Sequence, residues 1–197
     1  AFNKVSQVVT GMSVTGRPYH VYNGSLGIAR TAADAETMLG SFTRVVDNIS
    51  WVNGFTFVFG NGNLDEPAVG RSDISASPAN GFNAVAVGGV RMAGLYPDQE
   101  DDQLWADGSF LNPPSQNGDR TKPDIVAPVN VLVPNPFSNP PFANMVNSGS
   151  GTSFSAPQVA AVTALVMETA WQAKGRPELI RALLASTATP LVNGLPP

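Results

Sequence analysis

Residues 147–167 read NSGSGTSFSAPQVAAVTALVM, a glycine-rich turn that leads into an apolar helix. Ser153 stands at the mouth of this helix, between Gly151 and Pro157. A helix N-terminus offers unpaired N–H groups and a positive dipole, and both stabilise a developing anion. Ser153 is therefore a candidate nucleophile, although serine is also a common helix N-cap with no further role.

The composition around this segment indicates one globular domain, residues 1–197, with 43% apolar and only 13% charged residues. A net charge of −4 and the lack of any Lys/Arg run argue against a nucleic-acid partner. No cysteine is present, so disulfides and thiolate sites are excluded. No uninterrupted apolar stretch is long enough to span a membrane, so no membrane partner is expected. The N-terminus does not resemble a signal peptide, so an export signal would lie upstream or have been removed.

Strand-like and helix-like segments alternate along the chain. Helices are expected at residues 2–15 and 32–48, and two more near the end show apolar spacing over 159–170 and 179–184. Strands are expected at residues 19–27, 55–63, 83–90 and 124–133. This order predicts an α/β fold in three layers, with a mostly parallel sheet covered by helices on both faces. Ligands of such sheets bind at the carboxyl ends of the strands, where the Ser153 loop is also expected to arrive.

The segment GTSFSAPQVAA resembles the serine signature of the subtilases, the subtilisin-like serine proteases. Further segments resemble other parts of that family in the same order: HVYNGSLG, FVFGNGN, SASPANGFNAVAVGGV, TKPDIVAPVNVLV and RPELIRALLASTATPL. Together they cover the chain from Tyr19 to Leu191. The chain is identified as the C-terminal portion of a subtilase catalytic domain whose N-terminal strands are missing.

The resemblance assigns roles to individual residues. It makes Ser153 the nucleophile and its own N–H one donor of the oxyanion hole. Asn61 becomes the second donor, although an Asn-Gly pair alone is a turn signal. An extended peptide or protein substrate would pair main chain to main chain with Ser25, Leu26 and Gly27. The facing wall of the substrate pocket would be formed by Val58, Phe59 and Gly60. The resemblance also implies a cis peptide bond before Pro78 and an extracellular, secreted protein.

A subtilase also requires an Asp after its first strand and a His at the start of a helix, both upstream of the S-L-G segment. The 24 residues that precede Ser25 contain no D-S-G, D-T-G or H-G-T. The only histidine, His20, lies five residues before Ser25, about 16 Å back along an extended strand. It is therefore expected at the opposite end of the strand from the catalytic edge, too far away to act as the base of Ser153. The chain alone is therefore expected to be inactive.

Two interpretations remain open. The chain is a protease part whose Asp and His come from an N-terminal segment, or it is an inactive homologue that binds peptides or proteins. The retention of Ser153 and Asn61 favours the first. A Rossmann-like small-molecule binder ranks last, because GNGN is not a dinucleotide-binding fingerprint.

The missing segment has a consequence for partners. The strand Tyr19–Ser25 is expected to be a sheet edge that pairs with an N-terminal fragment of the same precursor or with a second copy. No cofactor or metal is expected. Asp98, Glu100 and Asp102 alternate as in some calcium loops, but the required glycine and closing glutamate are lacking, so a solvated acidic loop is favoured and calcium dependence is left open.

Overall fold

The computed structural model describes residues 20–25, 41–64, 75, 77–92, 102–109, 121–135, 137–140, 144–147 and 150–189. The helix expected at 2–15 and the first part of the one expected at 32–48 lie outside these residues. None of the helices in the described ranges is long and apolar enough to cross a membrane.

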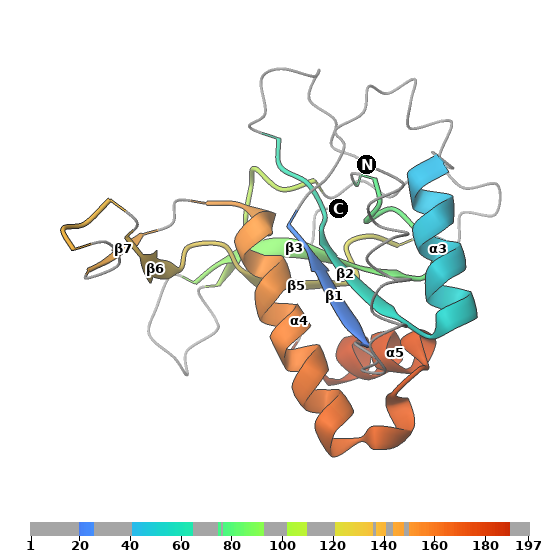
Figure 1. Ribbon diagram of the computed structural model, residues 1–197. Helices are drawn as coiled ribbons and strands as arrows, with labels where there is room; N and C mark the ends of the chain where they lie inside the picture. Colours follow the sequence, from blue (N-terminus) through green and yellow to red (C-terminus); the bar gives the residue numbers. More distant parts are fainter. Residues whose placement is uncertain are drawn as a thin grey trace.

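A five-stranded, mostly parallel sheet forms the centre of the molecule (Figure 1). Strand β2 (Thr56–Gly60) lies between β1 (Val21–Gly24) and β3 (Ala84–Arg91), and β5 (Ile125–Pro128) pairs with the other part of β3, all in parallel. The two-residue strand β4 (Gln103–Leu104) pairs antiparallel with the end of β3. Gly24 lies opposite Phe59 in the register, so β1 and β2 end side by side.

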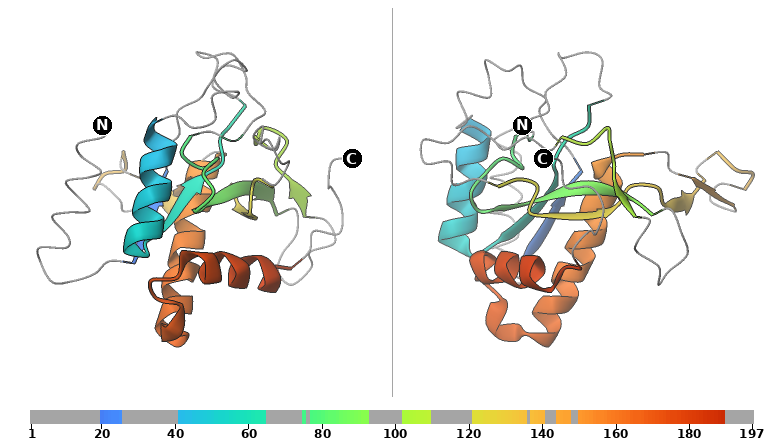
Figure 2. Two further views of the ribbon diagram at one scale, coloured as in Figure 1. Left: turned by 90° about the vertical axis from the view of Figure 1, so that its right-hand side faces the viewer. Right: turned by 180° about the vertical axis from the view of Figure 1, so that it is seen from behind.

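Helices cover both faces of this sheet, which confirms the predicted α/β architecture (Figure 2). Helix α3 (Ser41–Asn53) packs on one face, and α4 (Thr152–Thr169) and α5 (Pro177–Thr187) pack on the other. The alternation of β2 explains this division, because successive strand residues point to opposite faces. Val58 belongs to the cluster under α4 and α5, while Phe57 and Phe59 belong to the cluster under α3, with stacked rings whose centroids are 6.0 Å apart.

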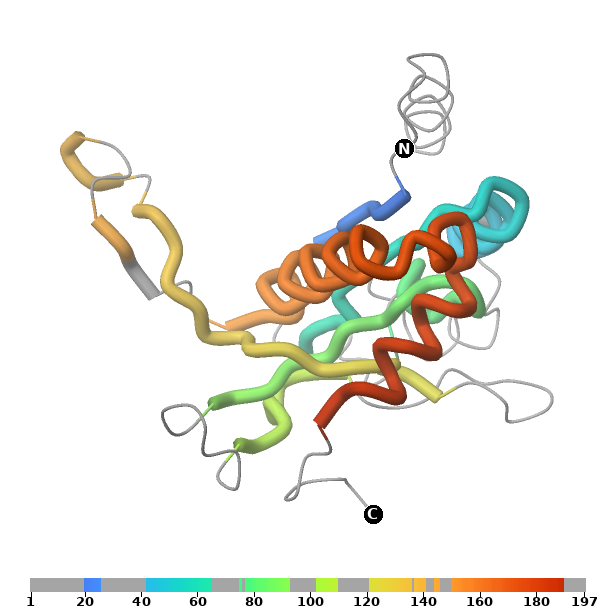
Figure 3. Tube along the Cα trace, turned by 90° about the horizontal axis from the view of Figure 1, so that it is seen from below, coloured from blue at the N-terminus to red at the C-terminus, as the bar shows by residue number. Residues whose placement is uncertain are grey.

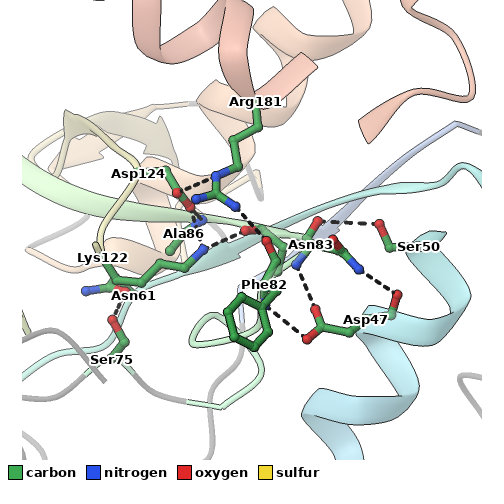
Figure 4. A network of polar contacts seen from close by, with 11 residues as sticks. Asp47, Ser50, Asn61, Ser75, Phe82, Asn83, Ala86, Lys122, Asp124 and Arg181 are labelled. Carbon is green, nitrogen blue, oxygen red and sulfur yellow. Dashed lines mark hydrogen bonds and ion pairs between the residues drawn. The ribbon is translucent and has the colours of Figure 1, made fainter. Parts of the chain in front are cut away.

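A buried ion-pair network fastens α5 to the sheet (Figure 4). The Lys122 ammonium donates to Asp124 Oδ2 at 2.7 Å and to the Ala84 carbonyl at 2.8 Å. Arg181 on α5 meets the other carboxylate oxygen of Asp124 at 2.7 Å. Burial lowers the pKa of Lys122, and the neighbouring Asp124 carboxylate opposes that shift. The network therefore replaces much of the hydration that these buried charges lose.

A hairpin projects from this body (Figure 3). Strands β6 (Leu132–Pro134) and β7 (Met145–Asn147) form it, in antiparallel pairing. The expected strand region at 124–133 is thus divided between β5 and β6, and neither β4 nor β7 was expected. The peptide bond before Pro78 is cis, as the resemblance implied.

Helix α4 has two apolar faces, of which only one is covered by the described residues. Val159, Ala160 and Met167 are buried against the sheet and α5. Val162 and Leu165 on the other face are 49% and 61% exposed. The apolar spacing over 159–170 includes Val162, and such spacing cannot identify the buried face of a helix that is apolar all round.

Candidate active site

The carboxyl ends of β1 and β2 and the N-terminus of α4 meet at one edge of the sheet. Ser25 follows β1, and its hydroxyl donates to the carbonyl oxygen of Ser153 at 2.7 Å. Asn23 Nδ2 donates to the Ser25 hydroxyl in turn, at 3.2 Å. Two serines that are 128 residues apart in sequence are thereby held in contact.

Helix α4 is anchored to β5 close to its first turn, which fixes the position of Ser153. The buried Ser155 hydroxyl donates to the carbonyls of Ala127 and Pro128, at 2.9 and 3.1 Å. Gln158 Nε2 donates to the same Pro128 carbonyl at 2.8 Å. Ser155 and Gln158, which follow the G-T-S triplet, thus hydrogen-bond the start of α4 to β5.

Ser153 itself occupies the second position of α4. Its Oγ donates to the Ser25 carbonyl oxygen over 3.5 Å, a long contact that a stronger acceptor could displace. Its peptide N–H lies in the first helical turn, where no intrahelical acceptor exists. Across the part of the chain that the structure describes, no residue accepts a hydrogen bond from this N–H, so it remains available to a ligand.

The loop after β2 contacts the same turn through Asn63. Its Oδ1 accepts from the peptide N–H and from the hydroxyl of Thr152, both at 3.0 Å. The Thr152 hydroxyl also accepts from the Gly62 N–H at 3.3 Å. A side chain at Gly60 would begin 2.9 Å from Thr152 Oγ1, so glycine is needed for this approach. Loop and helix end are therefore closely joined.

Asn61 lies two residues earlier and points elsewhere. It is fully buried; its Nδ2 donates to the Ser109 carbonyl, and its Oδ1 accepts from the Ser75 hydroxyl (Figure 4). The amide thus links the end of β2 to Ser75 and to Ser109. A donor role for Asn61 stays a prediction, and it would require Nδ2 to give up the bond to Ser109.

The predicted substrate-binding residues fall into three groups. Ser25 is exposed at the strand end, where a peptide could reach its main chain. Val58, Phe59 and Gly60 are buried in β2. Leu26 and Gly27 lie outside the described residues. The structure brings Ser25, Gly60 and Ser153 to one edge, and the substrate roles themselves stay predictions.

No base accompanies the nucleophile in the described ranges. The only acceptor for Ser153 Oγ there is a peptide carbonyl, which does not take up protons near neutral pH. His20 precedes β1 at the opposite end of the strand from Ser25, as expected, and its Nδ1 is buried without a partner. Nor do the described residues contain a group of three or more side chains suited to a metal ion. Asp98 and Glu100 of the acidic loop lie outside those residues, whereas Asp102 is buried.

Comparison with known proteins places this geometry in context. The model of the Subtilase family (Peptidase_S8) matches residues 3–196. Among solved structures, the self-cleaved protease domain of PatA is 21% identical, with a TM-score of 0.63 over 95% of this chain and 60% of that one. The prenylagaramide maturation protease PagA is 20% identical, with a TM-score of 0.63 over 96% of this chain and 58% of that one.

The PatG macrocyclase, solved in complex with a peptide, is 18% identical, with a TM-score of 0.61 over 94% of this chain and 48% of that one. At these identities the likeness concerns the fold. The chain spans about 60% of the length of the protease structures that it matches. Curated proteins give no match.

Proposed function

Because the chain belongs to the subtilase family, we propose that it forms the nucleophile-bearing part of a serine endopeptidase. The observation that carries the proposal is the free N–H of Ser153 beside its hydroxyl, at the start of α4. A nucleophile and an oxyanion donor on one residue suit acyl transfer.

The proposed reaction begins with attack of Ser153 Oγ on the carbonyl carbon of a peptide bond. The hydroxyl proton passes to a base, and the carbonyl oxygen becomes an oxyanion near the Ser153 N–H. Collapse of this intermediate expels the amine, which takes the proton back, and leaves an acyl-enzyme that water hydrolyses. The base and the acid that orients it come from an N-terminal segment, since the described residues place no base beside Ser153.

An extended peptide is the substrate class that suits this edge. Ser25 is exposed where β1 ends, and the residues that follow it would pair main chain to main chain with the substrate. We further propose an extracellular protein with no cofactor, a proposal that rests on the family resemblance alone. The competing function is an inactive homologue that binds peptides or proteins at the same edge.

The coding sequence upstream of Ala1 provides the first test. We expect it to encode an aspartate at the end of a strand and an H-G-T helix, and the longer protein should cleave peptides until Ser153 is replaced by Ala. Peptide binding without cleavage by the longer protein would establish the binding function instead.

A further inference from the structure

We infer that the phenyl ring of Phe59 positions the end of β1 that pairs with the substrate, and that it acts through Gly24 and Ser25 rather than by touching the substrate. The inference rests on the proposed function, in which Ser25 and the residues after it pair with an extended peptide. Phe59 is then a positioning residue for that pairing.

The side chain of Phe59 lies on the face of the sheet that α3 covers. It is 5% exposed and belongs to the same apolar cluster as Phe42 of α3. Helix α4, which carries Ser153, packs on the opposite face, over Val58. Successive residues of a strand point to opposite faces, so the ring of Phe59 lies across the sheet from the helix of the nucleophile. Its influence on a substrate would have to pass through the strands.

The ring of Phe59 fills the place where a side chain at residue 24 would lie. Gly24 is the register partner of Phe59, and a Cβ atom built on it would be 2.2 Å from both Cδ1 and Cε1 of the ring. Only a residue without a side chain permits this approach. Gly24 is also the one residue of β1 that is buried. The ring therefore determines how closely the end of β1 lies against β2.

A row of stacked aromatic side chains holds this ring in place. Phe57 lies almost parallel to Phe59, with 6.0 Å between the ring centroids, and Tyr22 stacks on Phe57 at 5.1 Å. Both distances are typical of favourable aromatic pairs. Because Tyr22 belongs to β1 and the two phenylalanines belong to β2, the row joins the strands along their whole pairing.

The residue after Gly24 contacts the nucleophile directly. The Ser25 hydroxyl donates to the Ser153 carbonyl at 2.7 Å, and the Ser25 carbonyl accepts from Ser153 Oγ over 3.5 Å. Within the described residues β1 pairs with β2 alone, so no further strand fixes this end from its other side. A shift of the strand end would displace the peptide-pairing edge relative to Ser153, and small displacements of this kind slow reactions strongly.

Acylation of Ser153 by two esters of different length tests the inference, with imidazole added as the base. The p-nitrophenyl ester of acetyl-tetra-alanine is long enough to pair with the β1 end, whereas that of acetyl-alanine is too short. Oγ bonds to the ester carbonyl carbon, imidazole takes the hydroxyl proton, and p-nitrophenolate leaves. The background rate measured with Ser153→Ala is subtracted, and the ratio of the two second-order rate constants, long over short, is the readout.

The decisive variant is Phe59→Val, which keeps an apolar strand-forming residue and removes the ring. The rate ratio should fall by about tenfold, the effect of losing one or two main-chain hydrogen bonds to the peptide. Phe55→Val is the matched control, because Phe55 lies in the same cluster, is 8% exposed and contacts Tyr22 near the start of β1. Both variants should lose stability, but only Phe59→Val should change the ratio, since an unfolded fraction slows both esters equally.

A second variant guards against a loss of folding in the first. Gly24→Ala adds one methyl group against the ring, so it should also lower the ratio. In the double variant Gly24→Ala/Phe59→Val the methyl group no longer meets the ring atoms. The two losses should therefore not add, and the double variant should have a ratio no lower than that of Phe59→Val.

Each outcome decides one point. An unchanged ratio in Phe59→Val, an equal fall in Phe55→Val or additive losses in the double variant would overturn the role of Phe59 and leave the proposed function intact. A parent chain that reacts but does not prefer the longer ester would overturn the pairing edge, and the role of Phe59 with it. A parent chain that reacts no faster than Ser153→Ala would overturn the proposed function itself.

Discussion

Strands β3 and β1 belong to one sheet but have different surroundings. All but the last of the eight residues of β3 are buried, and the strand pairs with β2, β4 and β5. Only one of the four residues of β1 is buried, and within the described part of the chain this strand pairs with β2 alone. The adjoining outer face of α4 is apolar and exposed at Val162 and Leu165. Within the described residues the core is thus complete around β3 but not around β1, and Ser153 contacts Ser25 at the end of β1.

The largest expected effect of the incomplete β1 side is on the rate of substrate turnover. The chain alone should hydrolyse peptide esters no faster than about 10³–10⁴ over water, the residual effect of binding and an oxyanion hole without a complete triad. Steady-state release of a chromogenic product measures this rate. Hydrolysis at rates typical of proteases, abolished by Ser153→Ala, would contradict the view that the β1 side lacks its catalytic partner.

The stability of the core around β3 should depend on the buried ion pair between Lys122 and Asp124. Asp124→Asn leaves the Lys122 ammonium, with a side chain only 1% exposed, without its carboxylate partner. The free energy of unfolding in urea should fall by about 3–5 kcal/mol, as for other broken buried pairs.

Glu178→Gln is the matched control for that experiment. It removes an ion pair with Arg176 in which both side chains are about 60% exposed, so it should cost less than about 1 kcal/mol. Equal losses for the two variants would show that the ion pairs around β3 stabilise the fold no more than surface pairs do.

The exposed surface formed by the β1 edge and the outer face of α4 should cause the chain to self-associate. Unpaired strand edges and exposed apolar faces bind other chains, so the chain should self-associate at the β1 and α4 surface. Leu165→Lys should reduce the mass measured by light scattering. Leu132→Lys is the control, because Leu132 lies on the projecting hairpin and is 68% exposed, close to the 61% of Leu165. This variant should leave the mass unchanged.

A fragment from the N-terminal part of the precursor should compete with this self-association and raise the melting temperature, because it binds the folded state. A parent chain that is monomeric and melts cooperatively at an ordinary temperature would contradict the prediction.

The smallest expected effect concerns the junction of the two regions. Ser155→Ala removes the buried hydroxyl that donates to two carbonyls at the end of β5, and should cost about 0.5–1.5 kcal/mol in urea unfolding. Ser186→Ala removes an exposed hydroxyl bond on α5 and should change stability by less than about 0.5 kcal/mol. A neutral Ser155→Ala would mean that Gln158 and apolar packing alone hold the helix against β5.

Much of the fold was predictable because its strands are short, apolar and closed by turn residues. The apolar segments at 55–63 and 83–90 contain β2 and β3, and the apolar spacing over 179–184 lies within α5. The short strands β4 and β7 were missed, since two or three residues carry no detectable alternation. The exposure of Val162 could not be predicted from its spacing, because periodicity identifies a buried face only where another face of the helix is polar.

The site was predictable to the level of its segments but not of its asparagines. Ser153, Ser25 and the loop after β2 meet where the strand ends predicted. Asn61 and Asn63 have the same chemistry, however, and their directions depend on the backbone between them. Gly62 has a φ of 121°, a conformation open mainly to glycine, and this bend brings Asn63 to Thr152. The φ of one glycine is not readable from composition or spacing.

The mutual contact of Ser25 and Ser153 makes the β1 edge and the nucleophile thermodynamically linked. Ser25 donates to the carbonyl of Ser153, so we expect a chain that pairs with β1 to change the position or rigidity of both serines. Linkage is reciprocal, so a covalent adduct on Ser153 must alter the affinity of the edge for its partner by the same factor. Titration of an N-terminal fragment against the free and the acylated chain would measure that factor, and equal affinities would show that the two sites are independent. With a factor above one, substrate would itself promote assembly of the catalyst.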